Sequence, residues 1–432
     1  MKKLVSLLLS AVLACSMLGS AVYAEEASGD VTIWYYWETE GHQKALNHII
    51  EEFNGSQDSI TVQAKYVPFA DFKKQLSIGA SADELPDLVI LDNPDHAAYA
   101  AMGIFADITD KFDVSNYYEG PVNSCTLDGK LYGVPFGSND LVLFYNEDML
   151  KEAGCEVPTT WDELEQVCAK IKEIDPKSIP LGYDSEANWF ITMCEQYGSP
   201  YTSATGDHYL FNNAKNKEFI KTFRNWYQSS YLTTQSLYGS YTSGLFTADS
   251  GTKSYMSIGS SAGATHQRPA AGADGKYPFE VGIASVPQVD ASNPKVISQG
   301  PSICIFKKAD PQEVIASWLF VKFLTTSVEF QAEFSMASGY VPVIKSVKDN
   351  PQYAAFLEKA DGGSYISALS AKVCLDQESA YYTSPAFKGS STARDQVGAL
   401  LVKCLTLDGG ANLDAAIDKA FADAIDECEY NG

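Results

Sequence analysis

The chain after residue 30 alternates between two hydrophobic periods. Three short segments are rich in β-branched and aromatic residues, which is typical of strands: residues 31–37, 59–67 and 87–92. Apolar residues at helical spacing follow each of them: residues 41–54, 70–80 and 94–103. This order predicts an α/β protein with a parallel, doubly wound sheet. In such a sheet, ligands bind beyond the carboxyl ends of the strands.

Aromatic and polar side chains stand where two of these predicted strands end. The stretch "WYYW" (34–37) places four aromatic residues in a row, although alternate side chains of a strand face opposite sides of the sheet. We therefore expect four residues at strand ends to contact a ligand: Trp37, Glu38, Asp92 and Asn93. Two alternatives stay open. Trp37 packs in the core, or Asp92 caps the helix that follows it.

The middle of the chain predicts a crossing between two lobes. A strand that begins near Gly133 breaks at "GSND" (137–140) and resumes as "LVLFYN" (141–146). Small polar residues interrupt an otherwise apolar strand at this point, which indicates a segment that passes from one lobe to the other. Further on, Thr160 and Glu163 have the spacing of a capping box and predict the start of a helix.

The first 24 residues have the pattern of an export signal. Lys2 and Lys3 precede an apolar stretch, residues 4–13, that is too short to span a bilayer. We expect cleavage after Ala24, because small residues precede that bond. The alternative is a lipoprotein box that ends at Cys15 and would leave a lipid-anchored protein. Either route places the mature protein in the periplasm or on the outer face of the cytoplasmic membrane.

The net charge of the chain excludes several partners. With 55 acidic and 31 basic residues, the formal net charge is -24. Such a charge argues against binding to nucleic acid or to anionic membrane surfaces. No stretch after the signal is long and apolar enough to predict a membrane span.

Cysteine and histidine usage gives no sign of a metal or cofactor site. Eight of the nine cysteines follow Cys15 at wide, irregular spacings, and no C-x-x-C occurs. We expect mostly buried thiols, with at most one disulfide. The five histidines lack metal-ligand spacing, and neither a P-loop nor G-x-G-x-x-G is present. The sequence therefore predicts no metal and no cofactor.

Two hydrolase hypotheses compete with a binding function. "GSSAG" (259–263) matches the nucleophile-elbow pattern, but His266 is the only histidine after Ser261 and no acidic residue lies between them. The order that this class of triad requires is therefore missing. Paired carboxylates for glycoside hydrolysis are uninformative in so acidic a chain. Hydroxyl and N–H groups of Ser260 and Ser261 at a helix start instead predict a binding site, and we expect no catalysis.

Six segments, in their order and spacing, resemble the extracellular solute-binding proteins of ABC importers, family 1, the maltose-binding-like group. They are "VTIWYYWE", "YGVPFGSNDLVLFYNEDMLKEAG", "VPTTWDELEQVCAKI", "GLFTADSGTKSYMSIGSS", "FEVGIASVPQ" and "ASWLFVKFLTTSVEFQAEFSMASGYVPVIKSV". The resemblance covers residues 29–430, and an export signal is what such a protein requires.

The resemblance implies a two-lobed, type II periplasmic-binding-protein-like fold with the ligand in a cleft between the lobes. We expect lobe 1 to comprise residues 29–138 and 286–346, and lobe 2 residues 139–285 and 347–432. It also implies a monomer that captures a sugar or oligosaccharide and delivers it to the transmembrane permease subunits.

Within this group, the pocket pattern is most similar to that of the glycerol-3-phosphate binders. That pattern implies further ligand-binding residues: Ser138 and Asn139 in "PFGSND", Trp189, Ser260 and Ser261, Gly300 in "QGPS", Tyr340 in "SGYVP" and Arg394 in "STARDQ". The chain departs from it at Phe72 and Lys73, where those binders have a tyrosine and an acid. A neutral sugar and a polyol or sugar phosphate therefore both remain open as ligands.

Four of these residues also have an alternative, purely structural interpretation. In that interpretation, Trp189 caps its helix, Tyr340 packs in a turn near the hinge, Ser138 serves only the crossing, and Arg394 is a solvated surface charge.

Overall fold

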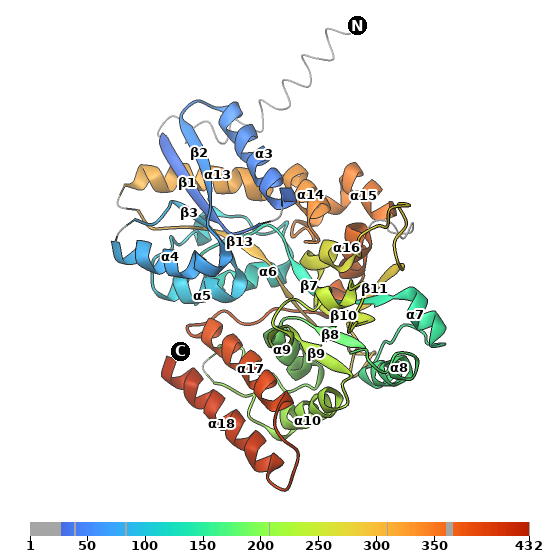
Figure 1. Cartoon of the computed structure of the whole chain (residues 1–432). Helices are drawn as coiled ribbons and strands as arrows, with labels where there is room; N and C mark the ends of the chain where they lie inside the picture. Colours follow the sequence, from blue (N-terminus) through green and yellow to red (C-terminus); the bar gives the residue numbers. More distant parts are fainter. Residues whose placement is uncertain are drawn as a thin grey trace.

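The computed structural model describes residues 27–38, 40–82, 84–206, 208–308, 310–359 and 366–431. The predicted export signal lies outside these residues. One sheet has five strands and another has seven, and helices surround both (Figure 1). We call the part around the five-stranded sheet lobe 1 and the part around the seven-stranded sheet lobe 2.

Lobe 1 contains a mixed sheet with the order β2-β1-β3-β13-β6. Its strands are β1 (Gly29–Tyr35), β2 (Ile60–Tyr66), β3 (Leu88–Asp92), β6 (Val134–Pro135) and β13 (Pro301–Ile305). The first three strands are parallel, as the alternating pattern predicts, and β13 is antiparallel to both β3 and β6. Its helices are α3 (Glu40–Ser56), α4 (Phe69–Ala82), α5 (Asn93–Ala101), α6 (Glu119–Ser124), α13 (Pro311–Thr326) and α14 (Val328–Ala337).

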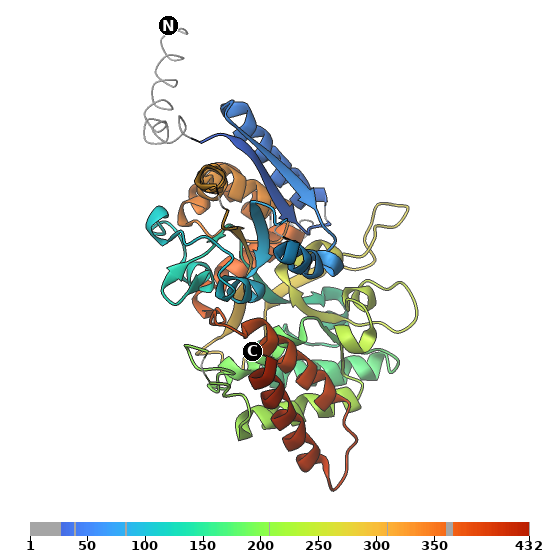
Figure 2. The same ribbon diagram turned by 90° about the vertical axis from the view of Figure 1, so that its left-hand side faces the viewer.

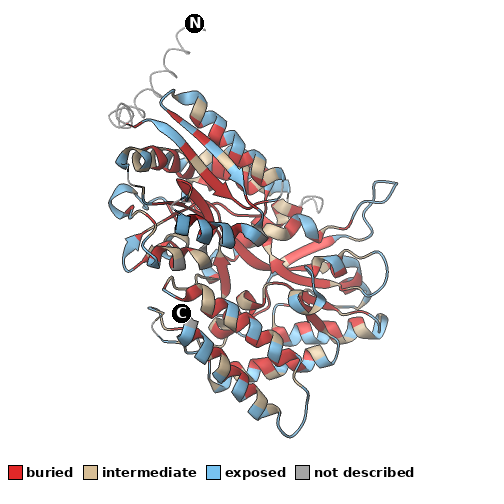
Figure 3. Ribbon diagram, turned by 60° about the vertical axis from the view of Figure 1, so that its left-hand side comes forward, coloured by how far each residue is buried: buried red, intermediate tan, exposed pale blue. Residues whose placement is uncertain are grey.

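Apolar faces of the helices bury the lobe 1 sheet. Helix α3 turns Leu46, Ile49 and Phe53 inward, three or four residues apart. The Phe53 ring lies 5.2 Å from that of Phe320 on α13. The inner strands of both sheets are buried, whereas alternate residues of the edge strand β2 and the outer faces of the helices are exposed (Figure 3). Each fully buried leucine or phenylalanine contributes about 1.5–3 kcal/mol to stability.

Lobe 2 is built around the long strand β7. Its sheet has the order β14-β12-β7-β10-β8-β9, and β11 also pairs with β7. The strands are β7 (Asn139–Asn146), β8 (Leu181–Tyr183), β9 (Leu232–Thr234), β10 (Met256–Ser260), β11 (Val281–Ser285), β12 (Val296–Gln299) and β14 (Tyr381–Tyr382). Its helices are α7 (Glu147–Glu152), α8 (Trp161–Ile174), α9 (Glu186–Gln196), α10 (Ala214–Gln228), α11 (Gln235–Tyr238), α12 (Ser243–Phe246), α17 (Ser390–Leu405) and α18 (Leu413–Asn431).

Local signals in the sequence fix several of these elements. The predicted capping box at the start of α8 is confirmed, because Glu163 N–H donates to Thr160 Oγ1 and Glu163 Oε2 accepts from Thr160 N–H. A cap of this kind stabilises a helix by about 1 kcal/mol.

The last two helices, α17 and α18, pack against each other and against lobe 2 (Figure 2).

The other elements complete the two lobes. Short elements are the hairpin β4 (Thr126–Leu127) and β5 (Lys130–Leu131) and the 3₁₀ helices Thr109–Lys111, Ser261–Gln267, Lys345–Asp349 and Glu378–Ala380. Helices α15 (Pro351–Glu358) and α16 (Ile366–Asp376) follow α14, and α16 packs on β7 and β11 of lobe 2.

Strand directions bring the ligand-binding ends of both sheets to the lobe boundary. In lobe 1, the carboxyl end of β3 at Asp92 pairs with Pro301, which follows the crossing residue Gly300. In lobe 2, the carboxyl end of β10 at Ser260 pairs with Leu141, near the start of β7. Loops that follow these strand ends therefore face the same boundary, where α/β sheets bind their ligands.

Two chain segments, one at Gly137 and Ser138 and one at Gly300, contact each other through their backbones at the lobe boundary. The chain leaves β6 at Pro135 and enters β7 at Asn139, so the predicted break at "GSND" is a true crossing. A Cβ atom on Gly300 would lie 2.2 Å from the carbonyl oxygen of Gly137 and 2.7 Å from the Cα of Ser138. Only glycine permits this backbone approach, because real Cβ atoms do not come so close to other atoms.

The strand memberships suggest where the lobes divide. The division expected from the sequence puts residues 286–346 in lobe 1, but β12 is part of the lobe 2 sheet. We propose that the chain crosses from lobe 2 to lobe 1 at Gly300, between β12 and β13. We also propose a further crossing between α14, which packs on α3 of lobe 1, and α16, which packs on β7 and β11 of lobe 2.

A buried acid lies beside the boundary at the start of β7. Asp140 is 2% exposed, and its N–H donates to Ser261 Oγ at 3.3 Å. Burial raises the pKa of its carboxyl group to about 7, although the nearby side chains of Tyr381, Ser298 and Cys374 favour the charged form. Asp140 therefore titrates near neutral pH.

The crossing predicts a strong effect of a single methyl group. Gly300→Ala forces the two crossing segments apart, and we expect it to destabilise the protein by about 1–3 kcal/mol or more. Gly263→Ala is the matched control, because its Cβ would meet no atom within 4 Å. Chemical denaturation of both variants measures the difference, and equal stabilities would contradict the tight crossing.

The raised pKa of Asp140 predicts a pH-dependent stability. The folded-state pKa of about 7 exceeds the ordinary 3.8, so the folded protein binds this proton more tightly than the unfolded chain does. Its contribution to the free energy of unfolding therefore falls as the pH rises from about 4 to about 7. We expect Asp140→Asn to match the parent near pH 4 and to exceed it by about 2–4 kcal/mol at pH 8.

Denaturation of this variant at pH 4, 6 and 8 checks the prediction. The control is Asp58→Asn, which removes an exposed carboxylate of lobe 1. A stability difference between Asp140→Asn and the parent that does not change with pH would refute it.

Candidate ligand-binding site

A small polar cavity lies at the lobe boundary. Its volume is about 20 Å³, which is room for about one water molecule. Strand β12, the segment that follows β14 and the first turn of α17 supply most of its wall. The polar side chains around it are Ser124 from α6 of lobe 1 and Ser298, Gln299, Thr383, Ser384, Ser390 and Arg394 from lobe 2.

A second, narrower pocket adjoins this cavity and shares Ser298, Gln299 and Thr383 with it. Ser138 and Gly300 also line the second pocket, and Asn139 pairs with Gln299 across the strands. The structure therefore brings together four residues of the predicted site at one place: Ser138, Asn139, Gly300 and Arg394.

Arg394 is the most unusual of these side chains. It is 7% exposed, so it is not the solvated surface charge that the structural alternative assumed. Its guanidinium donates to Gln299 Oε1 at 3.1 Å, to Ser384 Oγ at 3.4 Å and to Asn188 Oδ1. All three acceptors are neutral groups.

The charge of Arg394 is only indirectly balanced. The ion pairs found within the described ranges do not include it, and burial lowers its pKa, while Asp95 and Asp395 among others favour the charged form. A buried charge with neutral partners is costly unless further hydrogen bonds satisfy it. The guanidinium has five N–H donors, so it can bind a hydroxyl or an anionic group in addition to these partners.

The N-terminal end of α17 lies beside the same cavity. Gly389 has φ 89°, a left-handed conformation that favours glycine, and it lets the chain turn into the helix. Ser390 and Arg394, one turn apart, both line the cavity. The N–H of Ser390 donates to the carbonyl oxygen of Phe387, so α17 contributes the side chains of Ser390 and Arg394 to the cavity wall.

Two predicted stacking rings are core residues instead. Trp189 is fully buried, stacks on Tyr183 at 4.1 Å and meets Phe223 edge-on at 4.6 Å. Trp37 is 5% exposed and packs against Phe136 and Phe334. In this structure both rings are therefore buried among aromatic side chains and do not line the cavity.

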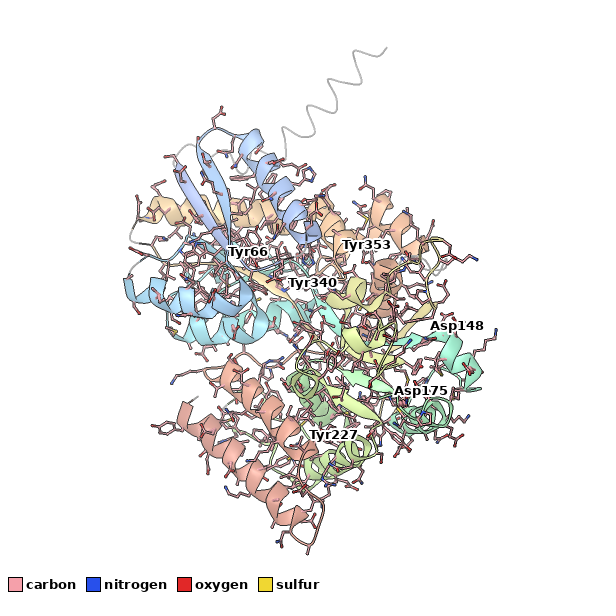
Figure 4. The ribbon with its side chains drawn as sticks, viewed as in Figure 1. Tyr66, Asp148, Asp175, Tyr227, Tyr340 and Tyr353 are labelled. Carbon is pink, nitrogen blue, oxygen red and sulfur yellow. The ribbon has the colours of Figure 1, made fainter. Side chains whose placement is uncertain are left out.

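Tyr340 belongs to the same aromatic group as Trp37. Its ring stacks on Phe334 at 5.3 Å and contacts His42 at 5.5 Å, and it is 6% exposed. Figure 4 places Tyr340 near the middle of the molecule, where the lobes meet. The structural alternative, packing near the hinge, describes its position.

The two predicted serines have backbone partners. Ser260 Oγ accepts from the N–H of Ala262, and Ser261 is fully buried and accepts from Asp140 N–H. The helix that follows them is a 3₁₀ helix, Ser261–Gln267. The Ser261 hydroxyl holds the end of β10 against the start of β7, whereas the Ser260 hydroxyl bonds locally and Ser260 is half-buried.

The remaining predicted residues lie at the lobe 1 edge. Glu38 is exposed and accepts from the hydroxyl of Tyr66, which Figure 4 shows in lobe 1. The side chains of Asp92 and Asn93 lie outside the described part of the structure, and the backbone of Asp92 ends β3.

Three residues that contact Arg394 were missed: Asn188, Gln299 and Ser384. Asn188 precedes Trp189, and Gln299 precedes the quoted Gly300. Asn188 follows the carboxyl end of β8, so the rule that selected Trp37 and Asp92 also points to it once β8 is recognised as a parallel strand. Ser384 lies in an irregular segment that carries no such signal.

Other functional classes find little support in the described ranges. These ranges contain no group of three or more side chains placed to hold a metal ion. The eight cysteines after residue 124 are free thiols, seven of them buried. Burial raises the pKa of the Cys125 thiol to about 12. None of the described helices combines the length and the apolar character that crossing a membrane requires.

Comparison with known sequences identifies relatives. The lactose-binding protein of Rhizobium radiobacter is 28% identical over 224 residues, 50% of this chain and 51% of that protein. The chain thus spans about half the length of this relative. The sn-glycerol-3-phosphate-binding periplasmic protein UgpB of Rhizobium meliloti (strain 1021) is 25% identical over 345 residues, 76% of this chain and 79% of that protein.

Comparison with solved structures gives the fold. The crystal structure of the cyclic alpha-maltosyl-1,6-maltose binding protein from Arthrobacter globiformis matches with a TM-score of 0.76 at 24% identity, covering 94% of this chain and 100% of that one. The chain therefore has the predicted two-lobed, type II periplasmic-binding-protein fold. A family model described as "Bacterial extracellular solute-binding protein" matches residues 48–359. Because this match covers most of the chain, the protein belongs to the bacterial extracellular solute-binding proteins.

Proposed function

We propose that the protein is the receptor of an ABC importer and that it captures a sugar or oligosaccharide between its lobes. The observation that carries this proposal is the buried Arg394 in a polar cavity at the lobe boundary. Sugars need donors and acceptors for every buried hydroxyl, and the serine, threonine, glutamine and arginine side chains around this cavity supply both. The name of the lactose-binding relative supports the same ligand class.

Ligand capture requires the lobes to separate. A cavity of about 20 Å³ is far smaller than the pockets that bind small molecules, which enclose about 300–1,000 Å³. We propose that the two lobes open about the crossings at Ser138 and Gly300, admit the ligand and close over it. Closure excludes water from the ligand, and the closed form is the one that a permease would recognise.

A polyol or sugar phosphate is the second candidate ligand. The buried guanidinium of Arg394 at the cavity wall suits an anion. The relative named for sn-glycerol-3-phosphate matches most of the chain. The net charge of -24 and the proximity of Asp95 to Arg394 oppose an anion. We therefore rank the neutral sugar first.

The family is extracellular, which places the protein outside the cytoplasm. We propose that an export signal is removed after Ala24, with lipidation at Cys15 as the alternative. We also propose that the protein is a monomer without catalytic activity. The position of Ser261 supports the absence of serine-hydrolase activity. A nucleophilic serine must be exposed, whereas Ser261 is fully buried and bonded to the backbone.

A ligand screen tests the proposed function. The mature protein is heated with neutral mono- and oligosaccharides, with glycerol-3-phosphate and with sugar phosphates. A ligand at about 100 times its Kd stabilises the folded protein by about 2.7 kcal/mol, which raises the melting temperature measurably. Chromatography of the ligand afterwards should recover it unchanged. Turnover of any glycan, or no shift with any sugar or phosphate, would contradict the proposal.

Arg394 predicts which ligand class binds. We expect Arg394→Gln to weaken a phosphate ligand about ten- to hundredfold, because a charge-assisted hydrogen bond contributes about 1.5–3 kcal/mol. A neutral sugar should lose less than about tenfold. Calorimetry measures both affinities. The matched control is Arg224→Gln, since Arg224 is a buried arginine of lobe 2 that donates to the backbone oxygen of Leu407. Equal affinities in both variants would place the ligand elsewhere.

A further inference from the structure

Helices α5 and α17 contact each other across the lobe boundary. Ser391 on α17 donates its hydroxyl to Asp95 Oδ1 on α5 at 2.7 Å, although 296 residues separate them in the sequence. The two helices lie next to each other where lobe 1 meets lobe 2 (Figures 1 and 2). This hydrogen bond joins the lobes independently of the crossing segments.

The contact lies at the edge of the polar cavity. Ser391 follows the cavity residue Ser390 directly and precedes Arg394 by three residues, which is nearly one helical turn. Asp95 lies in the first turn of α5, just after β3. The negative charge of Asp95 also acts on the buried guanidinium of Arg394. Lobe 1 therefore presents one carboxylate to both a hydroxyl and a cation of lobe 2.

We propose that Asp95 and Ser391 form a latch that holds the two lobes closed and slows release of the ligand. A hydrogen bond to a carboxylate is stronger than one between neutral groups. This bond exists only when α5 and α17 are together, so it stabilises the closed form selectively. The effect on ligand release rests on the proposed function, whereas the effect on lobe closure does not.

Neither Asp95 nor Ser391 lines the cavity, and Ser391→Ala leaves the charge of Asp95 beside Arg394 in place, so this variant separates the latch from ligand recognition. Removing the hydrogen bond between Asp95 and Ser391 should shift the equilibrium toward the open form, and by the same factor for every ligand. We expect Ser391→Ala to raise the dissociation rate about two- to tenfold with little change in the association rate. The order of affinities among different sugars should stay as it is in the parent.

Small-angle X-ray scattering of the mature protein without any ligand tests the closure itself. Ser391→Ala and Asp95→Ala should each increase the radius of gyration relative to the parent. The double variant should add little to either single change, because both remove the same bond. Ser81→Ala is the control, since Ser81 is an exposed helical serine of lobe 1 whose hydroxyl donates within its own helix. Circular dichroism confirms that each variant is folded.

Scattering curves of the two single variants that superimpose on the parent curve would overturn the latch. Full additivity of the two changes in the double variant would overturn it as well. Dissociation kinetics, measured with the sugar that gives the largest thermal shift, supply the second readout. If no sugar binds, the scattering result still decides the latch, so its failure and the failure of the proposed function remain distinguishable.

Discussion

The architecture depends on the close contact of two backbone segments at the lobe boundary. Gly300 approaches Gly137 and Ser138 so closely that no side chain fits between them. This contact sets the distance between the two sheets, and it directs the carboxyl ends of β3 and β10 toward one shared space. The polar cavity, the latch and the buried Asp140 all lie beside this contact, so a change there would reach each of them.

Polar side chains line the cavity at this boundary, although buried residues of β7 and β11 also pack in one apolar cluster with lobe 1. Arg394 is held by Gln299, Ser384 and Asn188, all neutral acceptors that lobe 2 or the crossing strand supplies. Such an arrangement keeps the guanidinium in place without neutralising it. A charge that stays unneutralised in the closed protein remains available to attract a polar ligand.

The sequence predicts the layers of the fold well and the site less well. Alternating periods and the capping box of Thr160 and Glu163 are local signals, so the parallel strands and α8 follow from short segments. Strand-end position points to Trp37 and the family resemblance to Trp189, but neither signal tells which neighbours bury an aromatic ring. Asn188 and Ser384 depend on the approach of α9 and α17 to β12, and only the folded chain brings them to Arg394.

The buried thiols carry a consequence for how this protein reaches its folded state. Its cysteines after residue 124 are free, most of them buried, and burial raises the pKa of thiols such as Cys125 and Cys404 to about 12. A thiol with so high a pKa is almost never a thiolate, so the native protein resists oxidation outside the cytoplasm. The unfolded chain has no such protection, and these eight thiols could form many wrong disulfides. Folding must therefore outpace oxidation each time a newly exported chain emerges.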